Sequence, residues 1–167
     1  MIIDSHCHLN YEPMSLAIKE TIKRANNDGV KYLLTISTED KSFNKILDII
    51  SSNKCVYGSY GIHPHEAKNH LLINSEDIIK KININKKLIG IGESGLDFYY
   101  NYSDKNDQIR CFEEHITAAQ KTKIPIIVHT RNAETETYEI LKRKMSEKEF
   151  KILIHCLTGY KEFAVSW

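Results

Sequence analysis

Short apolar runs alternate with longer, more polar stretches along this chain of 167 residues. The runs are continuous rather than alternating apolar and polar residues, which is typical of strands in a parallel sheet that is covered on both faces. The six runs span residues 2–3, 30–36, 55–60, 88–91, 124–128 and 151–154. This regular alternation of strand and helix predicts an α/β fold built on a parallel sheet.

Residues that commonly cap helices support the same division. Gly29 follows the first helical stretch, Asn74 or Ser75 precedes a third helix with an acidic first turn, and Asp104 precedes a long fourth helix. Residues 160–167 have the pattern of a sixth helix. The helical spacing itself is carried by Leu16, Ile22 and Ala25, by Phe43, Ile46, Leu47 and Ile50, and by Ile109, Phe112, Ile116 and Ala119.

The length of the chain limits the architecture to two choices. Six βα units of about 28 residues each are close in size to those of a (β/α)8 TIM barrel, but such a barrel typically needs about 250 residues. The chain therefore forms either an open sheet of six strands or a TIM-barrel type fold truncated after about six βα units. No linker, low-complexity segment or charge block divides it, so we expect a single domain over residues 1–167.

Composition excludes several classes of protein. A formal net charge of +1 gives no broad basic field, so contact with nucleic acid would come from a local site. No apolar stretch approaches the roughly 20 residues that cross a bilayer, and we expect no membrane partner. Because the four cysteines are widely spaced and no signal-peptide pattern opens the chain, we expect a cytoplasmic location.

Histidines and one glutamate recur where the apolar runs end. The carboxyl ends of parallel strands meet at one rim of a barrel, so side chains at these positions converge. Alternate residues of a strand share a face, which directs His6 and His8 to the same side and Cys7 to the other. Imidazole nitrogens with a carboxylate suit zinc, manganese or another first-row divalent ion. The sequence thus predicts a metal site made of His6, His8, Glu93, His129 and His155.

Glycines surround Glu93 in the segment GIGESGLD and leave room around its carboxylate, which could bridge two cations. The alternative is a solvated acid in a glycine-rich turn. Asp97 either orients a metal ligand or caps the loop that follows. Pro64 stiffens the loop that holds His63 and His65, so that one of these histidines faces a substrate phosphate, or the segment is simply a rigid turn.

Other residues give weaker signals. Arg131 suits bidentate contact with a phosphate, although a surface salt bridge would explain it nearly as well. Tyr99, Tyr100 and Tyr102 could stack on a base, but tyrosines in such places more often pack a loop. We expect four further residues outside the site, two of them histidines and two of them cysteines that act as small apolar packing residues: His70, His115, Cys7 and Cys156.

The segments DSHCHLN, GIHPH, GIGESGLDFYY, IVHTR and IHCLTG follow one another between residues 4 and 159. In this order they resemble the successive motifs of the TatD-related metal-dependent deoxyribonucleases, which belong to the amidohydrolase-like TIM-barrel group. The resemblance implies a hydrolase of DNA phosphodiester bonds that uses two divalent metal ions (Mg²⁺, Mn²⁺ or Zn²⁺) to activate water. Its substrate would be single-stranded DNA or DNA ends.

The resemblance also implies a role for each matched residue. His6 and His8 would hold one ion, His129 and His155 the other, and Glu93 would bridge the two. His63, His65 and Arg131 would help to hold the scissile phosphate. The family's last ligand, an aspartate near the end of the eighth strand in a stretch resembling ETD, has no counterpart before the chain ends, and Leu157-Thr158 replaces the usual Phe-Ser.

We therefore expect an N-terminal portion of a TatD-like barrel that lacks its last two βα units, through truncation, gene interruption or subcloning. Without strands seven and eight the sheet cannot close, which leaves strand edges unpaired and inward apolar residues partly exposed. Such edges favour self-association or binding of a C-terminal partner fragment. The alternatives are an inactive remnant, a metal-binding fragment, or an amidohydrolase-like enzyme for amides or esters, whose relatives commonly have a carboxylated lysine in place of Glu93.

Overall fold

The computed structural model of the chain describes residues 1–100 and 102–155. Its six strands are all parallel, and each pairs with the next one along the chain, so the sheet order is β1-β2-β3-β4-β5-β6. The strands are β1 (Ile2–Cys7), β2 (Val30–Thr35), β3 (Val56–Tyr60), β4 (Leu88–Asp97), β5 (Ile126–Arg131) and β6 (Ile152–Ile154). This sequential parallel sheet confirms the prediction of an α/β fold of TIM-barrel type with six strands.

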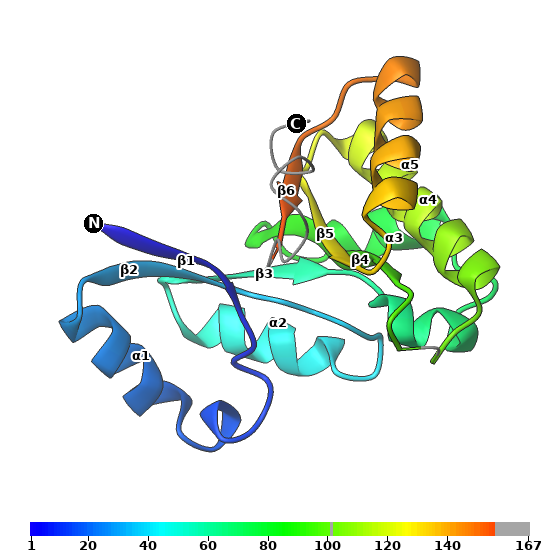
Figure 1. Cartoon of the computed structure of the whole chain (residues 1–167). Helices are drawn as coiled ribbons and strands as arrows, with labels where there is room; N and C mark the ends of the chain where they lie inside the picture. The colour runs from blue at the N-terminus through cyan, green and yellow to red at the C-terminus, as the bar shows by residue number, and fades with distance from the viewer. Residues whose placement is uncertain (101, 156–167) are drawn as a thin grey trace.

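The helices follow the outer, convex side of a strongly curved sheet (Figure 1). Their bounds are α1 (Ile18–Asn27), α2 (Phe43–Ser52), α3 (Ser75–Ile82), α4 (Lys105–Thr122) and α5 (Glu134–Glu147), with two 3-10 helices, η1 (Met14–Leu16) and η2 (Pro64–Asn69). Leu16 was expected in the first α-helix but lies in η1, where it is 74% exposed. The predicted sixth helix, Leu157-Thr158 and Cys156 lie outside the described residues.

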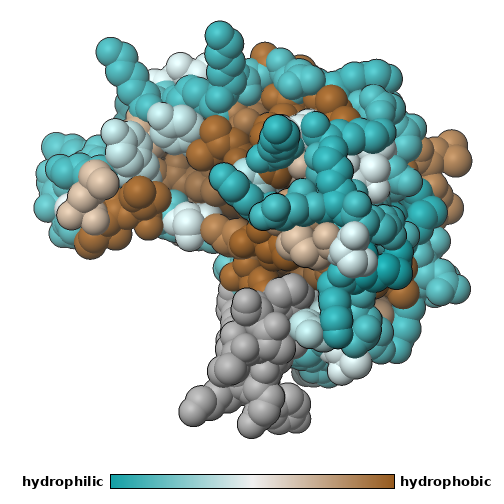
Figure 2. Space-filling view, turned by 90° about the horizontal axis from the view of Figure 1, so that it is seen from above, coloured by the Kyte–Doolittle hydropathy of each residue, from teal (hydrophilic) through white to brown (hydrophobic). Residues whose placement is uncertain are grey.

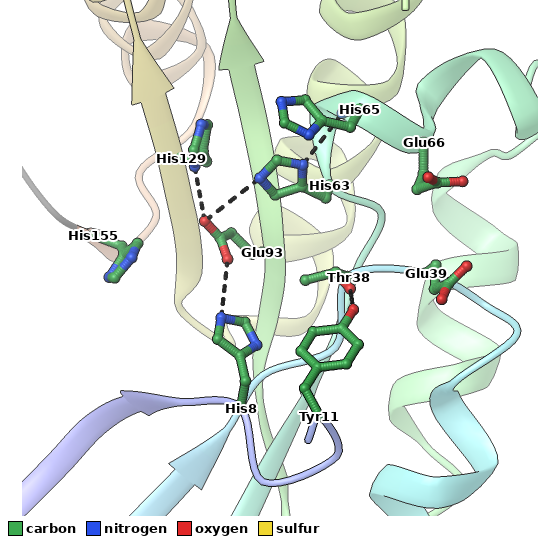
Figure 3. Close-up of a pocket in the computed structure, with 10 residues that line it drawn as sticks. All are labelled: His8, Tyr11, Thr38, Glu39, His63, His65, Glu66, Glu93, His129 and His155. Carbon is green, nitrogen blue, oxygen red and sulfur yellow. Dashed lines mark hydrogen bonds and ion pairs between the residues drawn. The ribbon is translucent and has the colours of Figure 1, made fainter. Parts of the chain in front are cut away.

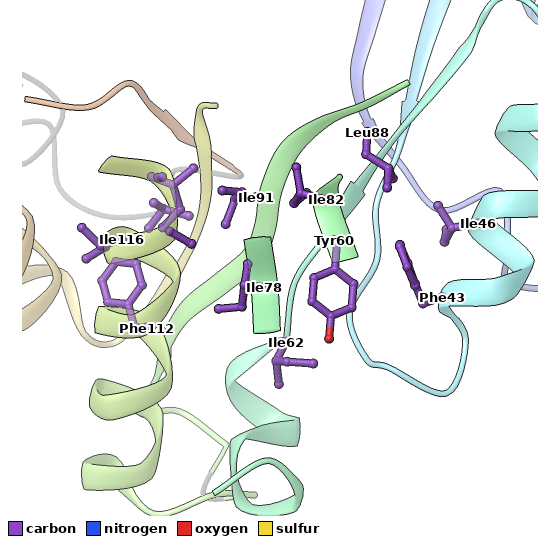
Figure 4. Packing of buried hydrophobic residues seen from close by; sticks show 14 of the residues in the cluster. Phe43, Ile46, Tyr60, Ile62, Ile78, Ile82, Leu88, Ile91, Phe112 and Ile116 are labelled. Carbon is purple, nitrogen blue, oxygen red and sulfur yellow. The ribbon is translucent and has the colours of Figure 1, made fainter. Parts of the chain in front are cut away.

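The hydrophobic core lies between the helices and the convex face of the sheet (Figure 4). Phe43 and Ile46 of α2 pack there, and so do Phe112 and Ile116 of α4, all of them fully or almost fully buried. These are the residues whose helical spacing predicted the two helices, because residues three and four apart share one helix face. The core therefore attaches the helices to the sheet and leaves the carboxyl ends of the strands free for function.

Three capping expectations can be checked directly. The Asn74 side chain accepts a hydrogen bond from the backbone N–H of Asp77 at 3.1 Å, so Asn74 rather than Ser75 caps α3. Asp104 is the residue before α4, as predicted, although its side chain makes no capping hydrogen bond. Gly29 follows α1 with a φ of +92°, a conformation that favours glycine.

Strand β4 is longer than its apolar run and ends at Asp97 rather than at residue 91. Ser94, Gly95 and Asp97 all pair with β5, which itself continues to Arg131. Glycines interrupt the apolar pattern here, yet they permit the pairing, because a Cβ at Gly95 would overlap the carbonyl oxygen of His129. Glu93 and His129 thus lie inside strands, where the backbone fixes their spacing, rather than beyond the strand ends.

The concave face of the sheet is apolar and, among the described residues, partly exposed. Ile3, Tyr32 and Ile89 are 57%, 43% and 44% exposed and line a hollow of about 360 Å³. Figure 2 shows apolar side chains gathered on this side of the molecule. The expectation of a sheet covered on both faces is wrong for this part of β1 to β4, whereas the expected exposure of inward apolar residues is confirmed. In a closed barrel these positions fill the interior.

The Gly95→Ala substitution should destabilise the protein by about 2 kcal/mol or more, because the added methyl group meets the His129 carbonyl and the φ of Gly95 is +148°. Gly29→Ala is the matched control, since its φ is also positive but only one side-chain atom, at 4.0 Å, would face the new methyl group. The control should lose about 1 kcal/mol. Urea unfolding followed by circular dichroism measures both losses, and equal losses would contradict the close packing of β4 on β5.

Candidate metal centre

Glu93 of β4 is 3% exposed and lies at the centre of a group of histidines (Figure 3). Its Oε1 accepts a hydrogen bond from Nδ1 of His129 at 2.9 Å and lies 3.9 Å from Nε2 of His63. Its Oε2 lies 3.3 Å from Nε2 of His6 and 4.0 Å from Nε2 of His8. Four imidazole rings from three separate segments of the chain thus surround one carboxylate.

The local structure explains how these rings converge. His6 is in β1, His8 is one residue beyond its end, and His129 is in β5, so three of the four rings come from the carboxyl-terminal parts of strands. His63 follows β3 as the residue before η2, and its Nδ1 accepts the backbone N–H of His65 at 3.2 Å. The rule that groups gather at the carboxyl ends of parallel strands therefore holds here.

A second buried carboxylate orients two of the histidines. Oδ2 of Asp97 lies 2.8 Å from Nε2 of His65 and 3.2 Å from Nε2 of His129. Oδ1 of Asp97 accepts the backbone N–H groups of Tyr99 and Tyr100 at 3.1 and 3.0 Å. The sequence left open whether Asp97 orients a ligand or caps a loop, and in the structure its two oxygens do both.

The charges in the site follow from these contacts. Burial acts to raise the pKa of Glu93, but the hydrogen bond from His129 and the nearby His6 hold it well below its usual range, so the carboxylate is ionised. Burial acts to lower the pKa of His129, but hydrogen bonds to Glu93 and Asp97 raise it above its ordinary value. Burial and the neighbouring His129 lower the pKa of His63 to about 3, so this ring is neutral.

The described residues fit a divalent metal ion. Two sets of three residues each bring their donor atoms within 4.8 Å of one another. One set is His6, His8 and Glu93, and the other is His63, Glu93 and His129. Nδ1 of His6 and Nδ1 of His8 are buried without a hydrogen-bond partner among the described residues, and Nε2 of His6 is not aligned for a hydrogen bond despite its contact with Glu93. Buried polar atoms normally have partners, and a cation would supply one.

The structure places His63 and His155 differently from the sequence-based expectation. His63, expected to hold a phosphate, lies in the donor set with Glu93 and His129. His155 lines the same cavity, but its ring stacks on His6 with centroids 3.4 Å apart and is in neither set. The assignment of His155 as a partner of His129 in metal binding stays a prediction.

His8, His63, Glu93 and His129 of the candidate metal centre line a cavity of about 340 Å³. Sequence reasoning missed several residues of its wall, among them Thr38 and Glu39, although both follow the second strand and the strand-end rule could have found them. Tyr11 was also missed, and its hydroxyl is hydrogen-bonded to that of Thr38. The lining residues are His8, Tyr11, Thr38, Glu39, His63, His65, Glu66, Glu93, His129 and His155.

Arg131 ends β5 and is stacked on aromatic rings. Its Cζ lies 4.1 Å from the ring centre of Tyr99 and 4.8 Å from that of Tyr100. The guanidinium group is therefore held over the rings of Tyr99 and Tyr100. Its role in holding a phosphate stays a prediction.

Of the residues expected outside the site, His70, His115 and Cys7 are not in the cavity wall, whereas Cys156 lies outside the described residues. His70 follows η2, and Cys7 packs partly buried against the core, where burial raises the pKa of its thiol to about 12. His115 is fully buried in α4, and its Nε2 accepts the backbone N–H of Ile62 at 3.1 Å while its Nδ1 donates to the carbonyl of Cys111 at 2.7 Å. His115 thus fixes the backbone immediately before His63, a role that helical spacing alone did not reveal.

A parallel barrel-type sheet with buried histidines and carboxylates at its strand ends defines a protein of the TIM-barrel class with a candidate metal site. Comparison with known families agrees: the TatD related DNase family matches residues 3–167, and the chain belongs to that family. The resemblance seen in the sequence motifs is thereby confirmed.

Individual relatives are similar over nearly the whole chain. An uncharacterized metal-dependent hydrolase of Buchnera aphidicola, BU355, is 39% identical over 166 residues, which are 95% of this chain and 62% of the relative. The uncharacterized metal-dependent hydrolase YabD of Bacillus subtilis is 31% identical, with coverage of 98% and 64%. The deoxyribonuclease Tat-D of Schizosaccharomyces pombe is 27% identical over 148 residues, 83% of this chain and 47% of the relative. The chain thus spans less than two thirds of the length of these relatives.

Solved structures show the same fold. The TatD homologue YjjV of Escherichia coli superposes with a TM-score of 0.86 at 24% identity, covering 98% of this chain and 63% of YjjV. A TatD family hydrolase of Entamoeba histolytica gives the same TM-score at 21% identity, with coverage of 99% and 61%. Within residues 1–100 and 102–155, none of the helices is long and apolar enough to cross a membrane.

The His115→Phe substitution should lower the free energy of unfolding by about 1–3 kcal/mol at pH 7, because the N–H of Ile62 loses its buried acceptor. Burial lowers the pKa of His115 to about 4. Below pH 6.5 the unfolded histidine binds a proton that the folded one refuses, so the wild-type protein loses stability on acidification and the variant lacks this loss. Urea unfolding at pH 7 and pH 5 should show that the difference in free energy of unfolding between the wild type and the variant is smaller at pH 5. A constant or larger difference would contradict a neutral His115.

Proposed function

We propose that this chain carries the catalytic centre of a metal-dependent hydrolase that cleaves phosphodiester bonds of DNA. The observation that carries the proposal is the buried Glu93 carboxylate, whose two oxygens each face a different set of histidines. A carboxylate shared in this way is suited to bridge two cations. Two divalent ions a few ångströms apart would supply an activated water and positive charge for the phosphoryl oxygens.

The protein residues would divide the work. His6 and His8 would hold one ion, His63 and His129 the other, and His155 is proposed as a further ligand. The neighbouring histidines keep the Glu93 carboxylate ionised, so a negative charge lies at the floor of the cavity. Oδ2 of Asp97 lies 2.8 Å from Nε2 of His65 and so fixes the orientation of this ring. His65 lines the cavity that a substrate phosphate would enter. Arg131 is proposed to contact a phosphate of the DNA backbone.

DNA is proposed as the substrate because the S. pombe relative is named a deoxyribonuclease. Divalent ions held by the two donor sets would also give a chain with a net charge of only +1 a local positive site for a phosphate. A phosphate must enter a cavity of about 340 Å³ to approach Glu93. An unpaired strand or a strand end does this more readily than a continuous duplex. The free thiols of Cys7, Cys55 and Cys111 agree with a reducing, cytoplasmic compartment.

A second candidate is a metal-binding unit that acts only with a complementary polypeptide. The exposed Ile3, Tyr32 and Ile89 of the concave face favour it, since residues 1–167 would form one domain with an unfilled interior. Adding the polypeptide that corresponds to the remaining third of a relative separates the two candidates. Turnover only in its presence supports the second candidate, and turnover by the chain alone supports the first.

The Glu93→Gln substitution should weaken binding of Mn²⁺ or Zn²⁺ by at least about tenfold and remove cleavage of single-stranded DNA, because both donor sets lose their shared anion. Isothermal titration calorimetry measures the binding, and gel analysis of a labelled oligonucleotide measures cleavage. Glu76→Gln is the matched control, as Glu76 pairs with Lys121 on the outer surface. Wild-type metal affinity in Glu93→Gln would refute the proposed centre.

The Asp97→Asn substitution should reduce metal affinity by about 10- to 100-fold, because it removes the charge that orients and polarises the His129 ring. Asp77→Asn, which loses only an exposed pair with Lys80, should leave the affinity unchanged. Calorimetric titration of both variants with Mn²⁺ tests this. Affinities within twofold of each other would show that Asp97 only caps its loop.

A further inference from the structure

Three tyrosines and an arginine form a patch beside the cavity, which we call the aromatic rim: Tyr99, Tyr100, Tyr102 and Arg131. We propose that the aromatic rim is a binding site for an unpaired nucleobase adjacent to the phosphate held in the cavity. The inference rests on the proposed function and adds to it the part of the substrate that is recognised.

The geometry connects the aromatic rim to the cavity through His65. The rings of Tyr100 and Tyr102 are parallel, with an interplanar angle of 1° and centroids 5.4 Å apart. Both rings meet His65 edge-on, at 5.5 and 4.8 Å. Since His65 lines the cavity, the stacked rings begin where the wall of the cavity ends. A nucleotide whose phosphate lies in the cavity would have its base within reach of these rings.

The exposure of the rings argues against a purely structural role. Tyr99 and Tyr102 are each 54% exposed and Tyr100 is 37% exposed, whereas Tyr60, which packs in the core, is 3% exposed. Tyrosines that merely fill a loop are covered by it, but these present apolar ring surface to solvent. Exposed aromatic surface beside a polar cavity is typical of a ligand site.

Asp97 links the aromatic rim to the candidate metal centre. Asp97 bonds His65 and His129 through Oδ2 and the backbone of Tyr99 and Tyr100 through Oδ1. The guanidinium group of Arg131 lies over the Tyr99 and Tyr100 rings, which fixes a cation among the aromatic faces. A preorganised combination of aromatic faces and positive charge suits a single strand, whose bases stack and whose phosphates are anionic.

This chemistry predicts the selectivity of the site. Every nucleobase has a flat π face, so stacking on tyrosine is tolerant of sequence, and the loss of one stacking residue commonly weakens binding about 5- to 100-fold. A base inside a duplex is already stacked on its neighbours and cannot reach the aromatic rim without unpairing. The aromatic rim would thus select unpaired nucleotides while the cavity binds the phosphate of any strand.

The test compares Tyr102→Ala with Tyr102→Phe, which retains the ring, and with Tyr32→Ala, which removes a partly exposed tyrosine from the concave face. Fluorescence anisotropy with Mn²⁺ measures binding to two labelled probes with phosphorothioate linkages, a single-stranded oligodeoxynucleotide and its abasic counterpart, which has the same backbone without bases. We expect Tyr102→Ala to lose about 5- to 100-fold on the first probe and less than twofold on the second. Tyr102→Phe and Tyr32→Ala should match the wild type on both.

The outcomes separate the inference from the proposed function. Equal binding of both probes by the wild type, or an equal loss on both probes in Tyr102→Ala, overturns base stacking and leaves the phosphodiesterase proposal standing. Binding of neither probe by the wild type overturns both. If Tyr102→Ala has the same melting temperature as the wild type, unfolding is excluded as the cause of a base-dependent loss of binding.

Discussion

The burial of one ionised carboxylate is the constraint on which the rest of this site depends. An isolated carboxylate in the interior would cost several kcal/mol, so Glu93 is stable there only with positive or donor groups close to both of its oxygens. His129 supplies a hydrogen bond at 2.9 Å, and its position follows from the pairing of β4 with β5. That pairing in turn requires Gly95, because any side chain would separate the strands. The electrostatics of the site therefore begin with the backbone geometry of two neighbouring strands.

Asp97 connects the floor of the cavity to its edge through hydrogen bonds. It shares His129 with Glu93, so one imidazole lies between two carboxylates and holds its proton more strongly than usual. The other oxygen of Asp97 fixes the backbone that follows β4, where Tyr99 and Tyr100 begin the aromatic rim. A continuous set of hydrogen bonds thus links the metal centre to the surface, and a change in Asp97 would disturb both.

The sequence is informative where the fold obeys a general rule and uninformative where side-chain packing decides. Parallel strands bring their carboxyl ends together, and this rule alone is enough to group His6, Glu93 and His129. The apolar pattern places the end of β4 too early, because glycines interrupt hydrophobic periodicity without interrupting backbone pairing. The choice between His63 and His155 beside Glu93 depends on ring orientation, which spacing along the chain does not encode.

The metal centre and the closure of the sheet are separate physical problems. Both donor sets come from β1, β4 and β5 and the segments that follow β1 and β3, and the continuous pairing from β1 to β5 fixes their distances. No contact that places Glu93 among the described residues depends on the concave apolar surface of Ile3, Tyr32 and Ile89. Covering that surface would add hydrophobic stabilisation in proportion to the apolar area removed from water. The geometry of the site can therefore be preorganised in these strands even where the stability of the whole barrel requires more.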